Sequence, residues 1–204
     1  MKVLLINGSP HRNGNTFLAL SEIANALQTE GIESEIVSVG AKPVRGCIAC
    51  GQCKEHGNNR CVFDDDICNV LSAKMKECDA LIVGSPVYYG QPNGTLLSLT
   101  QRLLYSASVY FAGKPVACVA VCRRGGATAA LQTLTMPFQI LNMPIVTSQY
   151  WNIVYGRAEG EAALDTEGMQ TMRSLAKNMA FMLRATDGQP KPQYEPRQAM
   201  HFIR

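Results

Sequence analysis

The chain has 204 residues, of which 47% are hydrophobic, and a formal net charge of +3. One domain with its own core is therefore expected, and the mild charge, without a basic stripe, argues against a nucleic-acid-binding protein. No stretch approaches the roughly 18 apolar residues of a membrane span, so we expect a cytoplasmic protein. Eight cysteines in such a chain favour metal or redox use over disulfides.

The N-terminal segment predicts a strand, a turn and a helix. Residues 2–6 form an apolar run, typical of a strand buried on both faces of a parallel sheet. Residues 7–16 hold two glycines and no acid, and Asn15 or Thr16 is placed to cap the next helix. This arrangement aims a helix N-terminus at an anion. The nucleotide P-loop and dinucleotide motifs are absent, which leaves a terminal phosphate monoester, or an ordinary turn that binds nothing.

The rest of the chain alternates strands and helices. Further strands are expected over residues 33–39, 79–84, 116–122 and 144–151, and further helices over 67–78, 95–111, 127–141 and 167–184. Five strands and five helices predict an α/β fold with a doubly wound parallel sheet in the order 2-1-3-4-5. Ligands of such sheets bind where the first and third strands diverge, which selects loops 7–16 and 85–94, with 123–126 beside them.

The domain is expected to span residues 1–186, with a cysteine-rich insertion at residues 40–63 after the second strand. Residues 187–204 are interpreted as a C-terminal arm. They contain three prolines and end in the apolar residues Met200, Phe202 and Ile203, so the arm is expected to pack on its own or on a neighbouring subunit.

The second loop suits a flat heteroaromatic ligand. The segment from Ser85 to Gly90 offers backbone N–H and C=O groups for the edge of a ring, and Tyr88 and Tyr89 offer aromatic faces for stacking. Each tyrosine alone is more typical of ordinary packing. Beside a phosphate-binding loop, the ligand interpretation is favoured.

Residues 8–16 and 84–89 together resemble the flavodoxin-like NAD(P)H-dependent FMN reductase family, over the chain to about residue 185. The resemblance implies that FMN is the cofactor and NAD(P)H the substrate. It places the FMN phosphate at Ser9, His11, Asn15 and Thr16, with Arg12 adjacent, and the isoalloxazine at Pro86, Val87, Tyr88 and Tyr89, closed by Arg124, Gly125 and Gly126. Hydride transfer to a flavin needs no protein acid or base, so no catalytic side chain is assigned.

The insertion contains Cys47, Cys50 and Cys53 at three-residue spacing, and Cys61 follows after seven residues. Such a loop can present thiolates to a cubane, whereas structural zinc usually takes two separate C-x-x-C pairs. On an FMN-binding fold this pattern resembles the iron–sulfur flavoproteins, although their typical gap before the fourth cysteine is shorter. A 4Fe-4S cluster, zinc and no metal remain open. The other cysteines, Cys68, Cys78, Cys118 and Cys122, are expected to be small buried hydrophobes.

The expected function is an FMN-dependent oxidoreductase that passes electrons from NAD(P)H, or from a reduced carrier, to a quinone-like acceptor, oxygen or peroxide, or another small acceptor. Ferredoxin is a candidate partner. One alternative is a flavodoxin-type electron carrier, but such carriers are usually acidic and the pI here is about 8.4. The second alternative is a redox sensor that uses the cysteine loop as a switch. The resemblance also implies a homodimer or homotetramer.

Overall fold

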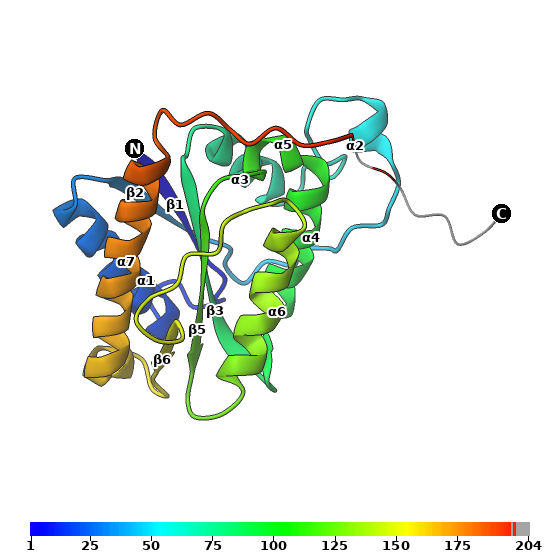
Figure 1. Cartoon of the computed structure of the whole chain (residues 1–204). Coiled ribbons are helices and arrows are strands. Elements are labelled where there is room, and N and C mark those ends of the chain that lie inside the picture. The colour runs from blue at the N-terminus through cyan, green and yellow to red at the C-terminus, as the bar shows by residue number, and fades with distance from the viewer. Residues whose placement is uncertain (197, 199–204) are drawn as a thin grey trace.

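The computed structural model describes residues 1–196 and residue 198, and a central sheet lies between two layers of helices (Figure 1). Five strands pair in parallel in the order β2-β1-β3-β5-β6. They are β1 Lys2–Asn7, β2 Glu33–Ser38, β3 Ala80–Tyr88, β5 Val116–Cys122 and β6 Ile153–Tyr155. The short strand β4, Gln91–Pro92, pairs antiparallel with the end of β3. Numbered without β4 the order is 2-1-3-4-5, so the predicted flavodoxin-like sheet is confirmed.

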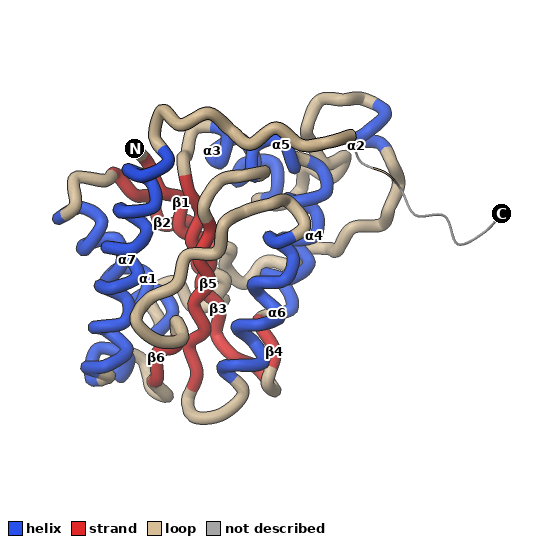
Figure 2. The backbone as a smooth tube through the Cα atoms, viewed as in Figure 1, coloured by secondary structure: helices blue, strands red, loops and turns tan. Residues whose placement is uncertain are grey.

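Helices cover both faces of this sheet (Figure 2). The helices are α1 Asn15–Thr29, α2 Gln52–Glu55, α3 Cys68–Lys76, α4 Gly94–Ser106, α5 Ser108–Phe111, α6 Ala127–Gln139, the 3-10 helix η1 Glu161–Leu164 and α7 Thr166–Thr186. One core joins the sheet to α1 and α7, and a second core joins its other face to α3, α4, α5 and α6. No helix in the described part of the chain is both long and apolar enough to traverse a lipid bilayer.

Strand β1 shows why the N-terminal run is almost wholly apolar. Val3 and Leu5 are buried in the core with α1 and α7, whereas Leu4 and Ile6 are buried in the core on the opposite face. Side chains of a strand alternate between faces, so a central strand covered on both sides needs apolar residues at every position.

The fifth strand was predicted in the wrong place. Residues 144–151 contain only one isolated bridge, between Ile145 and Val116, and the last parallel strand is β6, which follows them. The segment pairs with the start of β5, where the N–H of Val146 donates to the carbonyl of Val116 at 2.8 Å. It then leaves the sheet through polar residues and returns at Asn152, whose carbonyl accepts from Ala120 N–H at 3.0 Å.

Other boundaries also differ from those predicted. The segment from Ser85 to Tyr88, expected as loop, continues β3. The helix expected over residues 95–111 is interrupted at Ala107 and forms α4 and α5. Residues 187–196 are exposed and contain no helix or strand, and the apolar end of the expected arm lies outside the described residues.

Candidate functional site

The carboxyl ends of the parallel strands surround a cavity of about 420 Å³. This cavity, called the crevice below, lies at the point where β1 and β3 diverge, as expected for a doubly wound sheet. The predicted residues that line it are Ser9, His11, Asn15, Thr16, Pro86, Val87 and Tyr88. Partial burial raises the pKa of Tyr88, so its phenol stays protonated at neutral pH and can act as a hydrogen-bond donor.

The loop after β1 approaches β3 closely because it begins with glycine. The N–H of Gly8 donates to the carbonyl of Gly84 at 2.8 Å. A Cβ atom on Gly8 would lie 2.5 Å from Cδ2 of Leu96 and 2.9 Å from that carbonyl oxygen. Only glycine therefore fits without displacing the loop.

Asn7 and Ser9 fix the conformation of this loop from within. The side chain of Asn7, fully buried, accepts from Ser9 N–H at 3.1 Å and donates to the carbonyl of Arg12 at 3.3 Å. The hydroxyl of Ser9 accepts from His11 N–H at 3.1 Å. Sequence reasoning missed the role of Asn7, since an asparagine that ends a strand carries no distinct signal.

Helix α1 begins at the crevice, but its predicted cap is wrong. The N-cap is Gly14, which has no side chain to accept from the helix N–H groups. The first N–H groups of a helix lack intrahelical acceptors and carry a partial positive charge. Because Gly14, Asn15 and Thr16 line the crevice, this charge faces the crevice rather than a capping side chain.

The side chain of Asn15 fixes residues 156–159, which form another side of the crevice. Its amide nitrogen donates to the carbonyl of Ala158 at 2.8 Å, and its oxygen accepts from Ala162 N–H at 3.1 Å. Residues Gly156, Arg157 and Glu159 of this segment line the crevice. They were missed because the segment lies far from the first loop in the sequence.

Two arginines at the crevice were not assigned in advance. Arg123 and Arg157 line it together with His11, and Glu159 is the acid among the lining residues. Their charges favour an anionic ligand over a neutral one. The sequence placed Arg123 in the third loop but gave no reason to prefer it to its neighbour.

The rest of the predicted ring-binding set lies elsewhere. Arg124, Gly125 and Gly126 line a second cavity of about 430 Å³, together with the aromatic residues Tyr150, Trp151 and Tyr155. Gly126 has φ +86°, and a Cβ there would lie 2.7 Å from Cα of Gly90, so the glycine turn packs against the β3–β4 turn. Arg12 and Tyr89 are exposed and line neither cavity.

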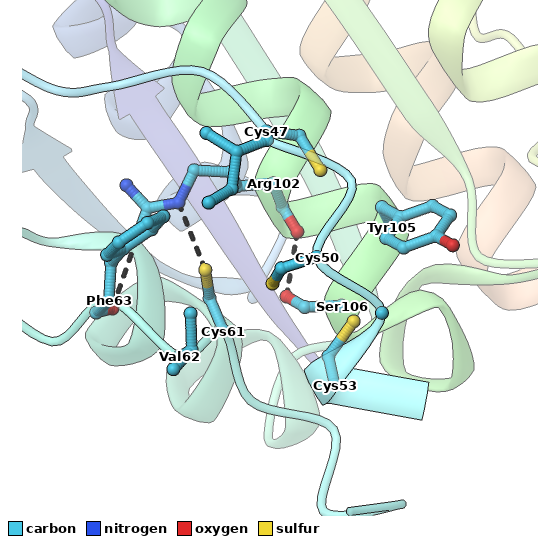
Figure 3. Close-up of a pocket in the computed structure, with 11 residues that line it drawn as sticks. Cys47, Cys50, Cys53, Cys61, Val62, Phe63, Arg102, Tyr105 and Ser106 are labelled. Atoms are coloured by element: carbon cyan, nitrogen blue, oxygen red, sulfur yellow. Dashed lines mark hydrogen bonds between the residues drawn. The ribbon is translucent and has the colours of Figure 1, made fainter. Parts of the chain in front are cut away.

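The four cysteines of the insertion lie around one small cavity of about 20 Å³, called the cysteine cavity below (Figure 3). Cys47 and Cys50 are exposed, whereas Cys53 and Cys61 are partly buried. Helix α4 contributes Arg102, Tyr105 and Ser106 to the lining. His56, the histidine of the insertion, does not line the cavity; its ring lies 2.9 Å from the amide oxygen of Gln52.

Arg102 is the charged residue buried in this region, with 1% of its side chain exposed. Its Nε–H donates to Cys61 Sγ at 3.2 Å, and its Nη1 pairs with Asp66, whose side chain is 6% exposed. Burial opposes the charge, but the hydrogen bonds with Asp66 and Cys61 outweigh it, so the pKa of Arg102 is raised. The guanidinium is therefore permanently charged.

Asn69 holds the backbone on which Cys61 sits. Its side-chain oxygen accepts from Cys61 N–H at 2.9 Å, and its amide nitrogen donates to the carbonyls of Cys61 and Phe63 at 3.0 and 3.1 Å. Asn69 is 4% exposed, so these bonds are shielded from water. The fourth cysteine of the pattern is thus fixed at both backbone and sulfur.

The remaining cysteines are buried, as predicted: Cys68, Cys78, Cys118 and Cys122. Burial raises the pKa of Cys68 and of Cys118 to about 12, although the positive charge of Arg102 opposes this shift at Cys68 and a hydrogen bond with Thr135 opposes it at Cys118. Neutral buried thiols are poor nucleophiles and poor metal ligands. Among the cysteines, the candidate metal ligands are therefore those of the insertion.

The donor set of the cysteine cavity fits a cluster better than a single ion. Within residues 1–196 and 198, no three His, Cys, Asp or Glu side chains are grouped closely enough to hold one metal ion. The four thiols nevertheless line one cavity. A 4Fe-4S cubane binds each thiolate through a different iron, so its ligands lie farther apart than those of one zinc ion.

Comparisons of the sequence with known proteins identify similar proteins along most of the chain. The sequence model of the family described as NADPH-dependent FMN reductase matches residues 1–158. An iron–sulfur flavoprotein of Methanocaldococcus jannaschii is 37% identical over 192 residues, covering 90% of this chain and 98% of the relative. An iron–sulfur flavoprotein of Methanosarcina thermophila is 31% identical over 189 residues, covering 90% of this chain and 95% of the relative.

Solved structures agree on the fold. A crystal structure of RosB with bound 8-demethyl-8-formylriboflavin-5'-phosphate superposes with a TM-score of 0.71 at 14% identity, covering 100% of this chain and 98% of RosB. An NADH:FMN oxidoreductase in its apo form gives a TM-score of 0.66 at 16% identity, covering 93% of this chain and 91% of that one. At such low identity these similarities support the fold alone.

Proposed function

Because the chain belongs to the NADPH-dependent FMN reductase family, within its iron–sulfur flavoprotein-like subgroup, we propose that it is an FMN-dependent oxidoreductase that takes electrons from NAD(P)H. The proposed acceptor is a small molecule such as a quinone, oxygen or peroxide, or a carrier protein such as ferredoxin. FMN, when bound, supplies the redox chemistry, and the protein binds and orients it.

The crevice is the proposed FMN site. The N-terminus of α1 and the loop at Ser9 and His11 would hold the phosphate, since free N–H groups and the helix dipole favour an anion. Arg157 on the opposite wall adds positive charge. Pro86 and Val87 at the end of β3 would contact the isoalloxazine ring.

The cysteine cavity is the proposed site of a 4Fe-4S cluster, held by Cys47, Cys50, Cys53 and Cys61. Such a cluster, when bound, supplies one-electron transfer. The protein's part is to fix the ligands and control their surroundings. Asn69 does this for the backbone of Cys61.

Assembly as a homodimer or homotetramer is part of the proposal. An open groove of about 520 Å³ lies next to Cys47 and is lined by Leu104, Tyr105 and Ile140 among others. Ile140 is 79% exposed and Tyr105 is 47% exposed. Burial of such a face against a second copy would remove apolar surface from water.

One observation carries the proposal: the loop after β1, the end of β3 and the residues at and just after the end of β5 line one crevice beside a helix N-terminus. The test is NAD(P)H oxidation by the FMN-loaded protein, followed at 340 nm with a quinone, with ferricyanide and with oxygen as acceptors. Turnover with at least one acceptor is expected. Absence of turnover with every acceptor, in protein that retains FMN, would favour a flavodoxin-type carrier instead.

A further inference from the structure

The proposed chemistry leaves one buried charge without a role. Arg102 lies on α4 with 1% of its side chain exposed, and its Nε–H points at Cys61 Sγ, 3.2 Å away (Figure 3). Burial of an arginine is costly unless each of its donors finds an acceptor. Its presence at the cysteine cavity therefore needs an explanation beyond packing.

The guanidinium is held in one orientation from several sides. Nη2 donates to the carbonyl of Phe63 at 3.1 Å, and Nη1 donates to the carbonyl of Arg45 at 3.4 Å and pairs with Asp66. With these contacts made, Nε–H is left for the sulfur of Cys61. The positive charge faces the cysteine cavity, and Asp66 balances it.

We propose that Arg102 is a positioning residue: it fixes Cys61 Sγ in the cysteine cavity, and its charge favours the reduced form of the iron–sulfur cluster held there. This inference rests on the proposed function, because it needs a cluster on the four cysteines. Adding one electron to a cluster adds one negative charge. A permanent positive charge beside a ligand sulfur, and a hydrogen bond to that sulfur, stabilise the more negative state.

Because Asp66 carries the opposite charge to Arg102, variants of the two residues should shift the cluster's reduction potential in opposite directions. Asp66→Asn removes a negative charge but leaves Arg102 and its contact with Cys61, so the cluster should become easier to reduce. Arg102→Met combined with Asp66→Leu removes both charges and the hydrogen bond to sulfur, so the cluster should become harder to reduce. The double variant avoids an unpaired buried acid, which would endanger folding.

Arg45→Met is the matched control. Arg45 is also near the insertion, with its guanidinium 4.4 Å from the centre of the Phe63 ring, and it pairs with Asp65. Its side chain is 54% exposed. Water screens its charge, so this variant should leave the cluster's potential nearly unchanged.

The measurement is an anaerobic redox titration of each variant with dithionite, followed by electron paramagnetic resonance, with iron and FMN assayed on the same samples. We expect the reduction equilibrium to shift about tenfold in opposite directions in the two test variants, about 59 mV for a one-electron couple. Loss of iron from the double variant alone, with FMN retained, would also support the positioning role of Arg102.

Two results would contradict the inference, and they are distinguishable. A wild-type protein without iron would overturn the proposed cluster and this inference with it. An iron-loaded wild type whose test variants keep its potential and iron content, or shift in the same direction, would overturn the inference alone. A shift in one direction would indicate general disturbance of the cavity rather than charge.

Discussion

The side-chain nitrogen of Asn15 donates to the carbonyl of Ala158 at 2.8 Å, across 143 positions of sequence. The same amide accepts from Ala162 N–H at 3.1 Å. These two bonds join the start of α1 to the segment that brings Arg157 to the crevice. The shape of the proposed FMN site therefore depends on a residue whose side chain is turned toward protein rather than toward the ligand.

Asn15→Ala should weaken FMN binding about tenfold or more. The change removes two hydrogen bonds, each worth roughly 1 kcal/mol, and frees the wall that carries Arg157. Fluorescence titration of the apoprotein with FMN measures the effect. Asn25→Ala, at an exposed position of the same helix, is the control and should leave the affinity unchanged. Equal affinities of both variants would refute this role of Asn15.

Gly8→Ala should destabilise the fold by roughly 1–3 kcal/mol, the usual cost of overpacking. The added Cβ would lie 2.5 Å from Leu96 and 2.9 Å from the Gly84 carbonyl, so the loop must move. Gly94→Ala is the control, because nothing lies within 4 Å of its Cβ position and alanine suits a helix. Urea denaturation of both variants measures the free energy of unfolding. If Gly8→Ala leaves it unchanged, the close approach of Gly8 to Gly84 and Leu96 is contradicted.

Asn69→Ala should weaken the binding of iron at Cys61 and lower the free energy of unfolding by roughly 1–3 kcal/mol. The reason is that the backbone N–H and C=O of Cys61 lose their partner in a buried place. Iron content after dialysis against a chelator reports the first effect and thermal unfolding the second. If the variant retains iron as the wild type does, iron binding by Cys61 does not depend on the hydrogen bonds from Asn69.

The exposed cysteines of the insertion should react with alkylating reagents, whereas the buried cysteines of the core should not. In protein freed of metal, iodoacetamide at pH 8 should label Cys47 and Cys50, which are exposed. Cys68 and Cys118 should stay unlabelled, because burial raises the pKa of each to about 12 and keeps the thiols neutral. Peptide mass spectrometry locates the label. Rapid labelling of Cys118 in folded protein would contradict its burial.

The sheet was predictable because most of its strands are marked in the sequence by short apolar runs. The runs at residues 2–6, 79–84 and 116–122 are apolar enough to identify buried parallel strands. The last strand was misplaced because β6 has only three residues, and the longer preceding segment has an apolar pair of its own, Ile145 and Val146. A strand that short is defined by its pairing with β5 and not by its own composition.

The candidate site was predictable only where its residues sit at or close after the ends of strong strands. Ser9, Thr16 and Pro86 meet at the crevice because topology brings strand ends together. Their contact with FMN stays a prediction. Arg157 and Arg102 were missed because each acts through tertiary contacts, and an arginine on an otherwise ordinary loop or helix has no sequence signal for burial or for a sulfur partner.

The most direct test of the account is the cofactor content of the native protein. The protein would be purified without oxygen, and FMN, iron and acid-labile sulfide would be measured on one sample, beside Cys61→Ser and the control Cys78→Ser. We predict about one FMN and, for a 4Fe-4S cluster, about four irons per chain in wild type and in Cys78→Ser, with iron lost in Cys61→Ser. A colourless protein without flavin would contradict the proposed function, and flavin without iron would contradict the cluster.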